Sequence, residues 1–145
     1  MPPVLHFNRI SDWPPLRGRE KLLARAATAA LEARGERVGE VSYTFVSADE
    51  IQALNRDYLE RDRPTDVIAF DLGSGDDLLG DVYISPEVAA ANAVEHGQAT
   101  EHEVLRLVIH GSLHVIGLDH PEDPGGETAP MFVLQEELLR ALLGG

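Results

Sequence analysis

Three histidines toward the C-terminal end constrain the fold of this chain more than any other feature. His110, His114 and His120 lie in the run His-Gly-Ser-Leu-His-Val-Ile-Gly-Leu-Asp-His. On a helix the first two stand on one face, about 6 Å apart along the axis. Gly117 can take positive φ and end the helix, so that the next segment turns His120 back toward the same point. The run therefore predicts a helix whose end is organised around one shared point.

Three imidazoles that converge with a fourth position open are the ligand set of a catalytic zinc. A structural zinc site usually closes with four protein ligands, and the chain has no cysteine to supply any. We therefore expect one Zn²⁺ per chain on His110, His114 and His120, although nickel, copper or iron also suit imidazole. Asp119 is a fourth ligand, a partner that orients an imidazole, or a turn residue, and the last two roles are favoured.

The residue after the first histidine bears on the reaction. The spacing His-x-x-x-His-x-x-Gly-x-x-His is shared with a large group of zinc peptidases, which carry a glutamate there as general base. Here the position is Gly111, which cannot move a proton, so peptide hydrolysis by that mechanism is disfavoured. A zinc-bound water still has its pKa lowered to about 7, and cations can stabilise charge on a phosphodiester. The motif therefore indicates a hydrolase and favours phosphoryl chemistry.

The histidine run resembles the signature of the YbeY family of rRNA-maturation endoribonucleases. Two further stretches resemble that family in the same order. Leu54–Phe70 contains Leu-Asn, then Tyr, Pro-Thr-Asp-Val and Phe, and Gly80–Ser85 reads Gly-Asp-Val-Tyr-Ile-Ser. Because three separate motifs agree in order and spacing, the resemblance is specific.

The resemblance implies a zinc-dependent endoribonuclease that favours single-stranded RNA, with His110, His114 and His120 as zinc ligands. Its role would be the maturation of ribosomal RNA, notably the small-subunit 3′ end, and ribosome quality control. Its partners would be rRNA, the ribosomal small subunit and assembly factors. We expect an α+β fold, in which a small mixed sheet of about four strands packs with helices. A zincin-like three-histidine site would lie on a central helix.

One position departs from the family pattern. Many members have an arginine directly after the tyrosine, where it is thought to serve at the active site, but this chain has Leu59. A leucine can neither contact phosphate nor stabilise charge. Arg61 is our candidate for the catalytic cation, and Arg56 and Arg63 are candidates for substrate binding. The alternative for all three is a solvated loop charge.

Five polar residues in the matching stretches are further candidates for substrate binding. Asn55 would hydrogen-bond the loop that contains Thr65 and Asp66, and this loop would lie beside the zinc. Asp81 and Ser85 would line the substrate cleft. The alternatives are turn residues for Thr65, Asp66 and Asp81, and a helix cap for Ser85.

The charge of the chain is unusual for a protein that binds RNA. Twenty-five acidic residues against 12 Lys and Arg give a net charge of −13, whereas phosphate contacts usually dominate nucleic-acid affinity. Basic residues do cluster early in the chain, at Arg9, Arg17, Arg19, Lys21 and Arg25. The net charge predicts weak binding to free RNA and delivery to its substrate by a partner protein.

Length and composition set the remaining limits. The 145 residues suit one domain spanning 1–145. Without cysteine there is no disulfide partner, which agrees with a reducing cytosol. We see neither a secretion signal at the N-terminus nor an apolar run near the ~20 residues of a membrane span. We therefore expect a cytoplasmic protein with no membrane partner.

Hydrophobic periodicity and turn signals give the expected elements. Strands are predicted at 4–8, 41–46, 66–71 and 79–85, the last two as an antiparallel hairpin. Helices are predicted at 17–33, 48–58, 86–95, from 100 through the first two histidines, and at 128–143. Capping boxes are expected at Ser47–Glu50 and Thr100–Glu103, with Ser85 and Pro86 opening another helix.

Two other functions remain open on the sequence alone. One is a ribosome-assembly binding module with a structural zinc and little or no catalysis, which Leu59 and the net charge favour. The other is a peptidase, which Gly111 disfavours. For the nuclease, either a water or the RNA 2′-hydroxyl would be the nucleophile.

Overall fold

Four short segments with alternating apolar residues build one mixed sheet in the computed structural model, which describes residues 3–35, 37–59, 65–72, 78–118 and 130–144. The strands are β1 (Val4–Asn8), β2 (Val38–Phe45), β3 (Val67–Asp71) and β4 (Leu78–Ile84), in the order β1-β2-β4-β3. Strand β2 pairs in parallel with β1 and β4, whereas β3 is antiparallel to β4. The predicted hairpin and the mixed α+β architecture are thus confirmed.

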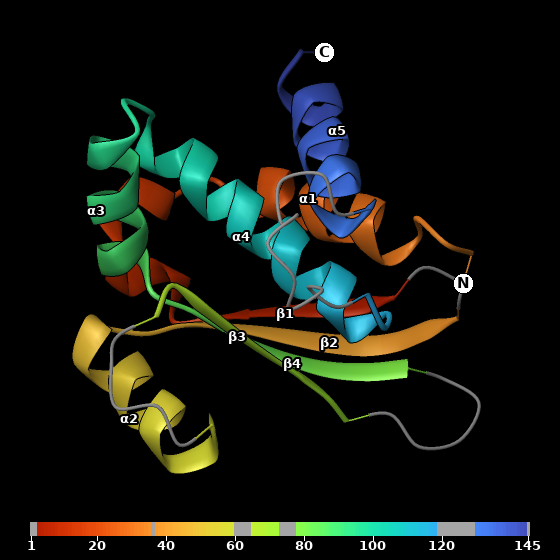
Figure 1. Cartoon of the computed structure of the whole chain (residues 1–145), viewed down its shortest axis with the longest axis horizontal. Helices are drawn as coiled ribbons and strands as arrows, with labels where there is room; N and C mark the ends of the chain where they lie inside the picture. Colours follow the sequence, from red (N-terminus) through yellow and green to blue (C-terminus); the bar gives the residue numbers. More distant parts are fainter. Residues whose placement is uncertain (1–2, 36, 60–64, 73–77, 119–129, 145) are drawn as a thin grey trace.

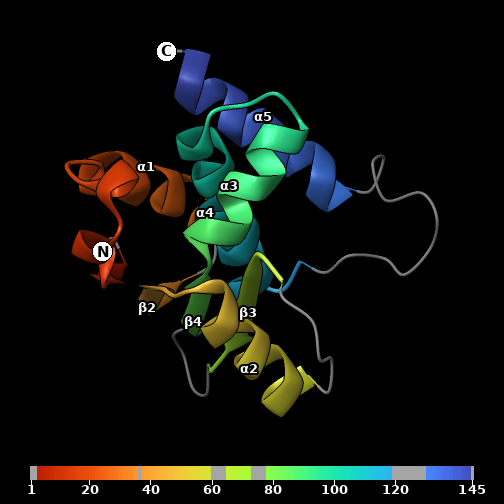
Figure 2. The same cartoon turned by 90° about the vertical axis from the view of Figure 1, so that its left-hand side faces the viewer.

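Helices cover the two faces of the sheet unequally. Four of them, α1 (Glu20–Leu31), α3 (Pro86–Glu95), α4 (Thr100–Val115) and α5 (Pro130–Gly144), lie on one side. Helix α2 (Ala48–Leu59) lies on the other (Figures 1 and 2). Helix α4 crosses the sheet between α3 and α5 (Figure 1), so it is the central helix of the larger layer. No helix in the described part of the chain is long and apolar enough to cross a membrane.

The alternation of side chains along β4 explains the two layers. Val82 and Ile84 face the α4 side and belong to the main core, which also contains Tyr43 and Phe45 of β2. Tyr83 points to the opposite face, into a smaller cluster. That cluster is formed by Val46, Ile51 and Ile68, with Leu54, Phe70 and Tyr83 packed against it.

Two of the three predicted helix caps are present. The Ser47 hydroxyl accepts from the Glu50 amide at 3.1 Å, and the Glu50 carboxylate accepts from the Ser47 amide at 3.0 Å, which is a capping box. Ser85 accepts from the Val88 amide at 3.3 Å and caps α3. The box predicted at Thr100 is wrong, because Ala99 is the N-cap and makes no side-chain cap bond.

Several helices and strands begin at other residues than predicted, because of local backbone conformation or contacts with other elements. Helix α1 begins at Glu20 instead of residue 17, because Gly18 takes a φ of +77° after the 3-10 turn Pro14–Leu16. Strand β2 begins three residues early, since Val38 is buried and pairs with Leu78. A further 3-10 turn at Ile10–Asp12 was not predicted. The predicted start of the last helix, at residue 128, lies outside the described residues.

Candidate metal centre

Helix α4 owes its central place to one strongly apolar face and to close packing on the sheet. Gly111 lies directly over β4, and a Cβ at this position would come within 2.6 Å of Val82 Cγ1. Gly80 makes the reciprocal contact, since a Cβ there would lie 2.5 Å from Val115 Cγ2. The two glycines therefore let the backbones approach. Gly111 also leaves no room for a glutamate, so the peptidase base is excluded by packing as well as by identity.

A buried hydrogen bond fixes the helix on the sheet beside this contact. The Ser112 hydroxyl donates to the Val108 carbonyl at 2.7 Å, and the Tyr43 hydroxyl of β2 lies 2.5 Å from Ser112 Oγ. Because the serine proton is used, Tyr43 is the donor. Burial raises the pKa of Tyr43 well above its ordinary value, so this phenol stays protonated and keeps donating.

His110 and His114 are half-buried and stand together on one side of the same helix, as their spacing predicts. Their Nε2 atoms are 3.1 Å apart, with ring centroids at 4.7 Å and an angle of 77° between the planes. Two nitrogens bound to one tetrahedral zinc at the usual bond lengths are about 3.3 Å apart. The chemistry and spacing of this pair therefore fit two ligands of a single zinc ion.

The end of the helix has the expected conformation. Helix α4 stops at Val115, and Gly117 takes a φ of +96°. The Gly117 amide donates to the His114 carbonyl at 3.0 Å, and the Leu118 amide donates to the Leu113 carbonyl at 3.0 Å. A left-handed glycine that closes the last turn is a common helix ending. It turns the chain away from the helix axis two residues before Asp119.

The predicted third ligand cannot be placed. His120 lies outside the described residues, as do Asp119, Arg61 and Arg63. Within the ranges that the structure describes, no group of three His, Cys, Asp or Glu side chains is close enough to hold a metal. The structure therefore brings together two of the three predicted ligands.

A glutamine that the sequence analysis missed contacts the histidine pair. Gln135 of α5 is only 5% exposed, and its Oε1 lies 2.6 Å from His110 Nδ1. A sequence signal for it does exist. Gln135 lies four residues before Leu139 and three after Phe132, so it is a polar residue on the apolar stripe of its helix. A buried polar group of this kind needs a partner.

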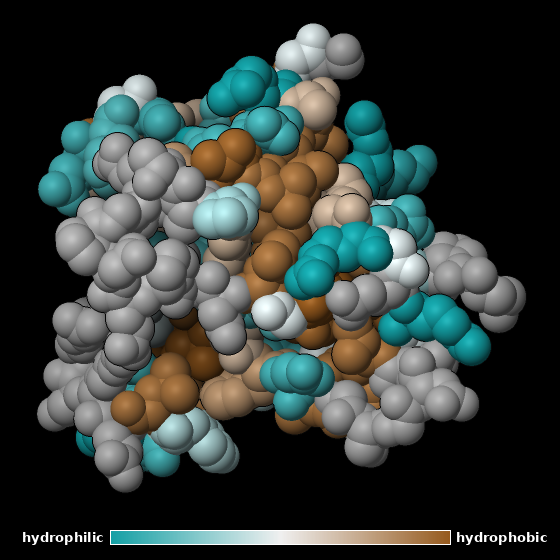
Figure 3. All heavy atoms as spheres, turned by 45° about the vertical axis from the view of Figure 1, so that its right-hand side comes forward, coloured by the Kyte–Doolittle hydropathy of each residue, from teal (hydrophilic) through white to brown (hydrophobic). Residues whose placement is uncertain are grey.

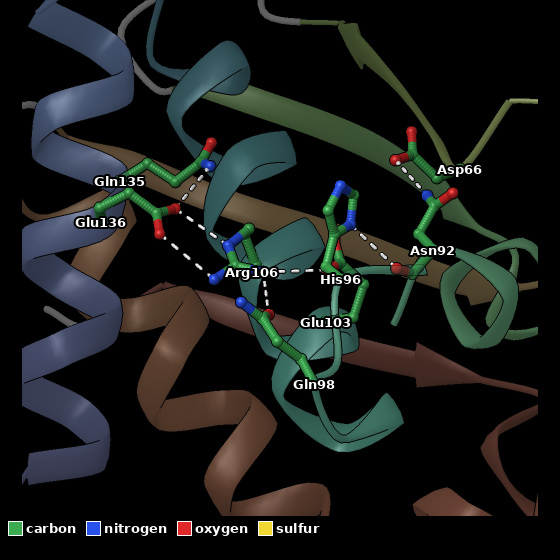
Figure 4. Close-up of polar contacts among 8 residues, drawn as sticks. All are labelled: Asp66, Asn92, His96, Gln98, Glu103, Arg106, Gln135 and Glu136. Carbon is green, nitrogen blue, oxygen red and sulfur yellow. Dashed lines mark hydrogen bonds and ion pairs between the residues drawn. The ribbon is translucent and has the colours of Figure 1, made fainter. Parts of the chain in front are cut away.

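Gln135 continues into a charged network between α5 and α4 (Figure 4). Its Nε2 donates to Glu136 Oε2 at 3.0 Å, and Arg106 Nε donates to the same oxygen at 2.9 Å. Arg106 also donates to Glu103 at 2.9 Å and to Gln98 at 2.7 Å. Burial lowers the pKa of Arg106, but Glu136 and Glu103 outweigh it, so the pKa lies above its ordinary value.

The candidates of the 65–85 region are placed around helix α3. Asp66 accepts from Asn92 Nδ2 at 3.3 Å (Figure 4), and its carbonyl accepts from the Ser85 amide at 3.0 Å. Ser85 is fully buried as the cap of α3, which is the alternative role considered for it. Thr65, which precedes β3, is partly exposed.

The candidates on α2 and Asp81 lie on the other side of the sheet from the histidine pair. Asn55 is 3% exposed and Arg56 is exposed, both on α2. Asp81 alternates with Val82, so it faces away from α4 and accepts from the Tyr83 hydroxyl at 2.8 Å. Burial and Asp81 raise the pKa of Tyr83 to about 12.

Asp81 also borders a small cavity beneath α2. This cavity of about 240 Å³ is lined by Leu54, Tyr58, Phe70, Leu72, Asp81 and Tyr83. Leu59, which follows Tyr58 in the chain, is 45% exposed. The lining of this cavity is therefore mainly apolar and aromatic, with one carboxylate.

Comparison with known proteins identifies relatives of the whole fold. The family model described as endoribonuclease YbeY matches residues 16–143. A protein named endoribonuclease YbeY from Carboxydothermus hydrogenoformans is 42% identical over 123 residues, which are 83% of this chain and 84% of the relative. One of the same name from Halalkalibacterium halodurans is 39% identical over 78% of each chain. The solution structure of TM1509 from Thermotoga maritima superposes with a TM-score of 0.63, at 31% identity, and covers 99% of this chain and 90% of that one.

Proposed function

The chain belongs to the YbeY endoribonuclease family, and on that premise we propose that it is a zinc-dependent endoribonuclease that cleaves single-stranded RNA. Its role would be the maturation of ribosomal RNA, notably at the small-subunit 3′ end, and ribosome quality control. The ribosomal small subunit and assembly factors would be its partners, in the cytoplasm. The name shared by its relatives supports cleavage of RNA, and the other parts of the proposal rest on the motif and the site.

The observation that carries the proposal is the pair of imidazoles on α4. His110 Nε2 and His114 Nε2 lie 3.1 Å apart, close to the separation of about 3.3 Å for two nitrogen ligands of one tetrahedral zinc. His120 would be the third ligand. A fourth position would stay open, as in catalytic rather than structural zinc sites.

Different residues of the chain would have different roles in the proposed reaction. Bound zinc would supply Lewis-acid chemistry and lower the pKa of a water to about 7. Gly111 offers no general base at the position directly after the first histidine. Arg61 would neutralise charge that develops on the scissile phosphate, and Arg63 would hold a neighbouring phosphate. Arg56, on α2, would contact RNA only on the other side of the sheet from the histidine pair. The nucleophile would be a water or the RNA 2′-hydroxyl.

Cleavage of a short single-stranded RNA by the purified protein tests the proposal. We expect activity that disappears after chelation, returns with zinc and is absent from His114→Ala. The variant guards against a contaminating nuclease. A 2′,3′-cyclic phosphate at the product end would identify 2′-hydroxyl attack, whereas a 3′-hydroxyl with a 5′-phosphate on the other product would identify attack by water. Activity that survives both chelation and His114→Ala would contradict the proposal.

A binding module with a structural zinc is the second candidate. The net charge of −13 and the exposed Leu59 favour it, because neither helps to hold RNA or stabilise charge. In that case the protein would bind one zinc, His114→Ala would lower its stability, and wild-type protein would leave the RNA intact.

A further inference from the structure

Gln135 lies where it can decide which nitrogen of His110 faces His114. It is buried on α5, outside the three matching sequence motifs, and its Oε1 is 2.6 Å from His110 Nδ1. We propose that Gln135 is a positioning residue that holds His110 in the Nδ1-protonated form, so that the unprotonated Nε2 points at the zinc. The zinc in this inference rests on the proposed function, whereas the position of the proton on His110 rests on the hydrogen bonds described above.

The first step is the orientation of the Gln135 amide. An amide has one accepting end and one donating end, which look alike in most structures. The Glu136 carboxylate, 3.0 Å from Gln135 Nε2, also accepts from the guanidinium of Arg106 at 2.9 and 3.2 Å. A carboxylate paired with a guanidinium accepts hydrogen bonds and does not donate them. The end of Gln135 at Glu136 must therefore be the NH₂ group.

The second step follows from that orientation. If the NH₂ group faces Glu136, the carbonyl oxygen faces His110, and an oxygen can only accept. The proton in this contact then belongs to His110 Nδ1. In a neutral imidazole the other nitrogen, Nε2, keeps its lone pair. This is the nitrogen that lies 3.1 Å from His114 Nε2.

The third step is the anchorage of the network itself. Arg106 lies on the same helix as His110, one turn earlier, and is held by Glu103 at 2.9 Å and Gln98 at 2.7 Å (Figure 4). Charge-assisted bonds of this kind are short and directional. The proton position on His110 is therefore set by a fixed cation through Glu136 and Gln135, and α5 takes part in the site without supplying a ligand.

Three variants at positions 135 and 136 separate the effect of hydrogen bonding to His110 from the effect of side-chain packing. Gln135→Met keeps the length and bulk of the side chain but cannot accept a hydrogen bond. Gln135→Glu keeps an oxygen acceptor for His110 but replaces the NH₂ donor at Glu136 by a second carboxylate oxygen. Glu136→Gln removes the fixed acceptor and lets the Gln135 amide turn over. Glu137→Gln is the matched control, because it makes the same charge change at the next, exposed position of α5.

Two measurements apply to each protein. The first is the tautomer of His110 in the metal-free chain, read from long-range ¹⁵N–¹H NMR correlations. The second is the dissociation constant for zinc, from competition with a chelating dye. For Gln135→Met we expect loss of the single Nδ1-protonated form and about 10- to 100-fold weaker zinc binding. Glu136→Gln should shift both readouts in the same direction, Gln135→Glu should keep the Nδ1-protonated form of His110, and Glu137→Gln should stay near wild type in both.

The outcomes are distinct for the two proposals. If wild-type and Gln135→Met proteins show the same tautomer and the same zinc affinity, Gln135 has no positioning role and this inference is overturned. If the wild-type chain binds no zinc, the proposed function fails, while the tautomer of the metal-free proteins still decides the role of Gln135. Circular dichroism of Gln135→Met checks that a weaker zinc site does not reflect an unfolded chain.

Discussion

Glu50 shows how much a single exposed residue can depend on its partners. Its carboxylate accepts from the Ser47 amide at 3.0 Å and from Arg9 at 2.8 and 3.0 Å, which joins the start of α2 to the end of β1. The hydrogen bond from Arg9, followed by that from Ser47, lowers the pKa of Glu50 to about 2. The side chain is still 46% exposed, so solvent screens part of this interaction.

We expect Glu50→Ala to lower the free energy of unfolding by about 1 kcal/mol at pH 7, the usual magnitude for a helix cap. Because the folded pKa is depressed, the stabilisation is present above the ordinary carboxyl pKa and is lost as the pH falls toward 2. Urea unfolding of wild type and variant at pH 7 and pH 3 should therefore give a difference that shrinks at pH 3. An equal difference at pH 7 and pH 3 would contradict this account of Glu50.

At this scale the sequence predicts local partners well and distant ones poorly. The bonds between Ser47 and Glu50 follow from a spacing of three residues, so the motif was sufficient. The contact of Gln135 with His110 spans 25 residues and two helices. No spacing rule links such residues, because only the packing of α5 against α4 brings them together.

At the scale of elements, the contact between α4 and the sheet predicts that a glycine-to-alanine substitution in a helix lowers stability instead of raising it. Alanine normally favours a helix over glycine by about 1 kcal/mol. At Gly111, however, a Cβ would lie 2.6 Å from Val82 Cγ1. We expect Gly111→Ala to destabilise the protein by about 1–3 kcal/mol, the range for overpacked cores, in chemical denaturation.

The same substitution in a Val82→Ala background is the control. The smaller side chain on β4 removes the nearest clashing atom, so Gly111→Ala should cost less there than in wild type. An equal loss of unfolding free energy in the two backgrounds would show that the added methyl group does not clash with Val82.

Element types follow from the sequence here more reliably than their ends. Ser85 followed by Pro86 predicts α3 correctly because both cap chemistry and a fixed φ act locally. The box predicted at Thr100 fails because Glu103 bonds to Arg106 instead and is itself 6% exposed. A tertiary ion pair thus outweighs a local capping preference.

At the scale of the whole molecule, net charge and surface chemistry bear on how RNA is held. The net charge is −13, and the face seen in Figure 3 carries a central band of hydrophobic side chains, with hydrophilic ones above it and to its right. A protein that makes 6–10 phosphate contacts loses about 10³- to 10⁵-fold in affinity between 50 and 200 mM salt. We expect weak binding to a free single strand here and a loss of less than about 10-fold over that range.

Fluorescence anisotropy with a labelled single-stranded RNA measures this dependence. A tight complex with a loss of 10³-fold or more would mean that a basic groove exists despite the net charge. A flat dependence with weak affinity would support delivery of the protein to its substrate by a partner.

The site as a whole is only partly predictable. His110 and His114 share one helix face, so their meeting follows from helical geometry. Asp81 lies on the far side of the sheet from them, because side chains alternate along β4 and Val82 faces α4. The sequence motif gives the order of such residues along the chain and not the side of the sheet to which each belongs.

The central position of β4 has an evolutionary consequence. The even-numbered residues of β4 face the α4 layer, and the odd-numbered residues face the α2 layer. Gly80 lies under Val115, and Tyr83 lies beside Phe70. One inserted or deleted residue within this strand would exchange the two sets and place Tyr83 under the helix. Gains and losses of residues among relatives should therefore accumulate in the connections, while β4 keeps a constant length.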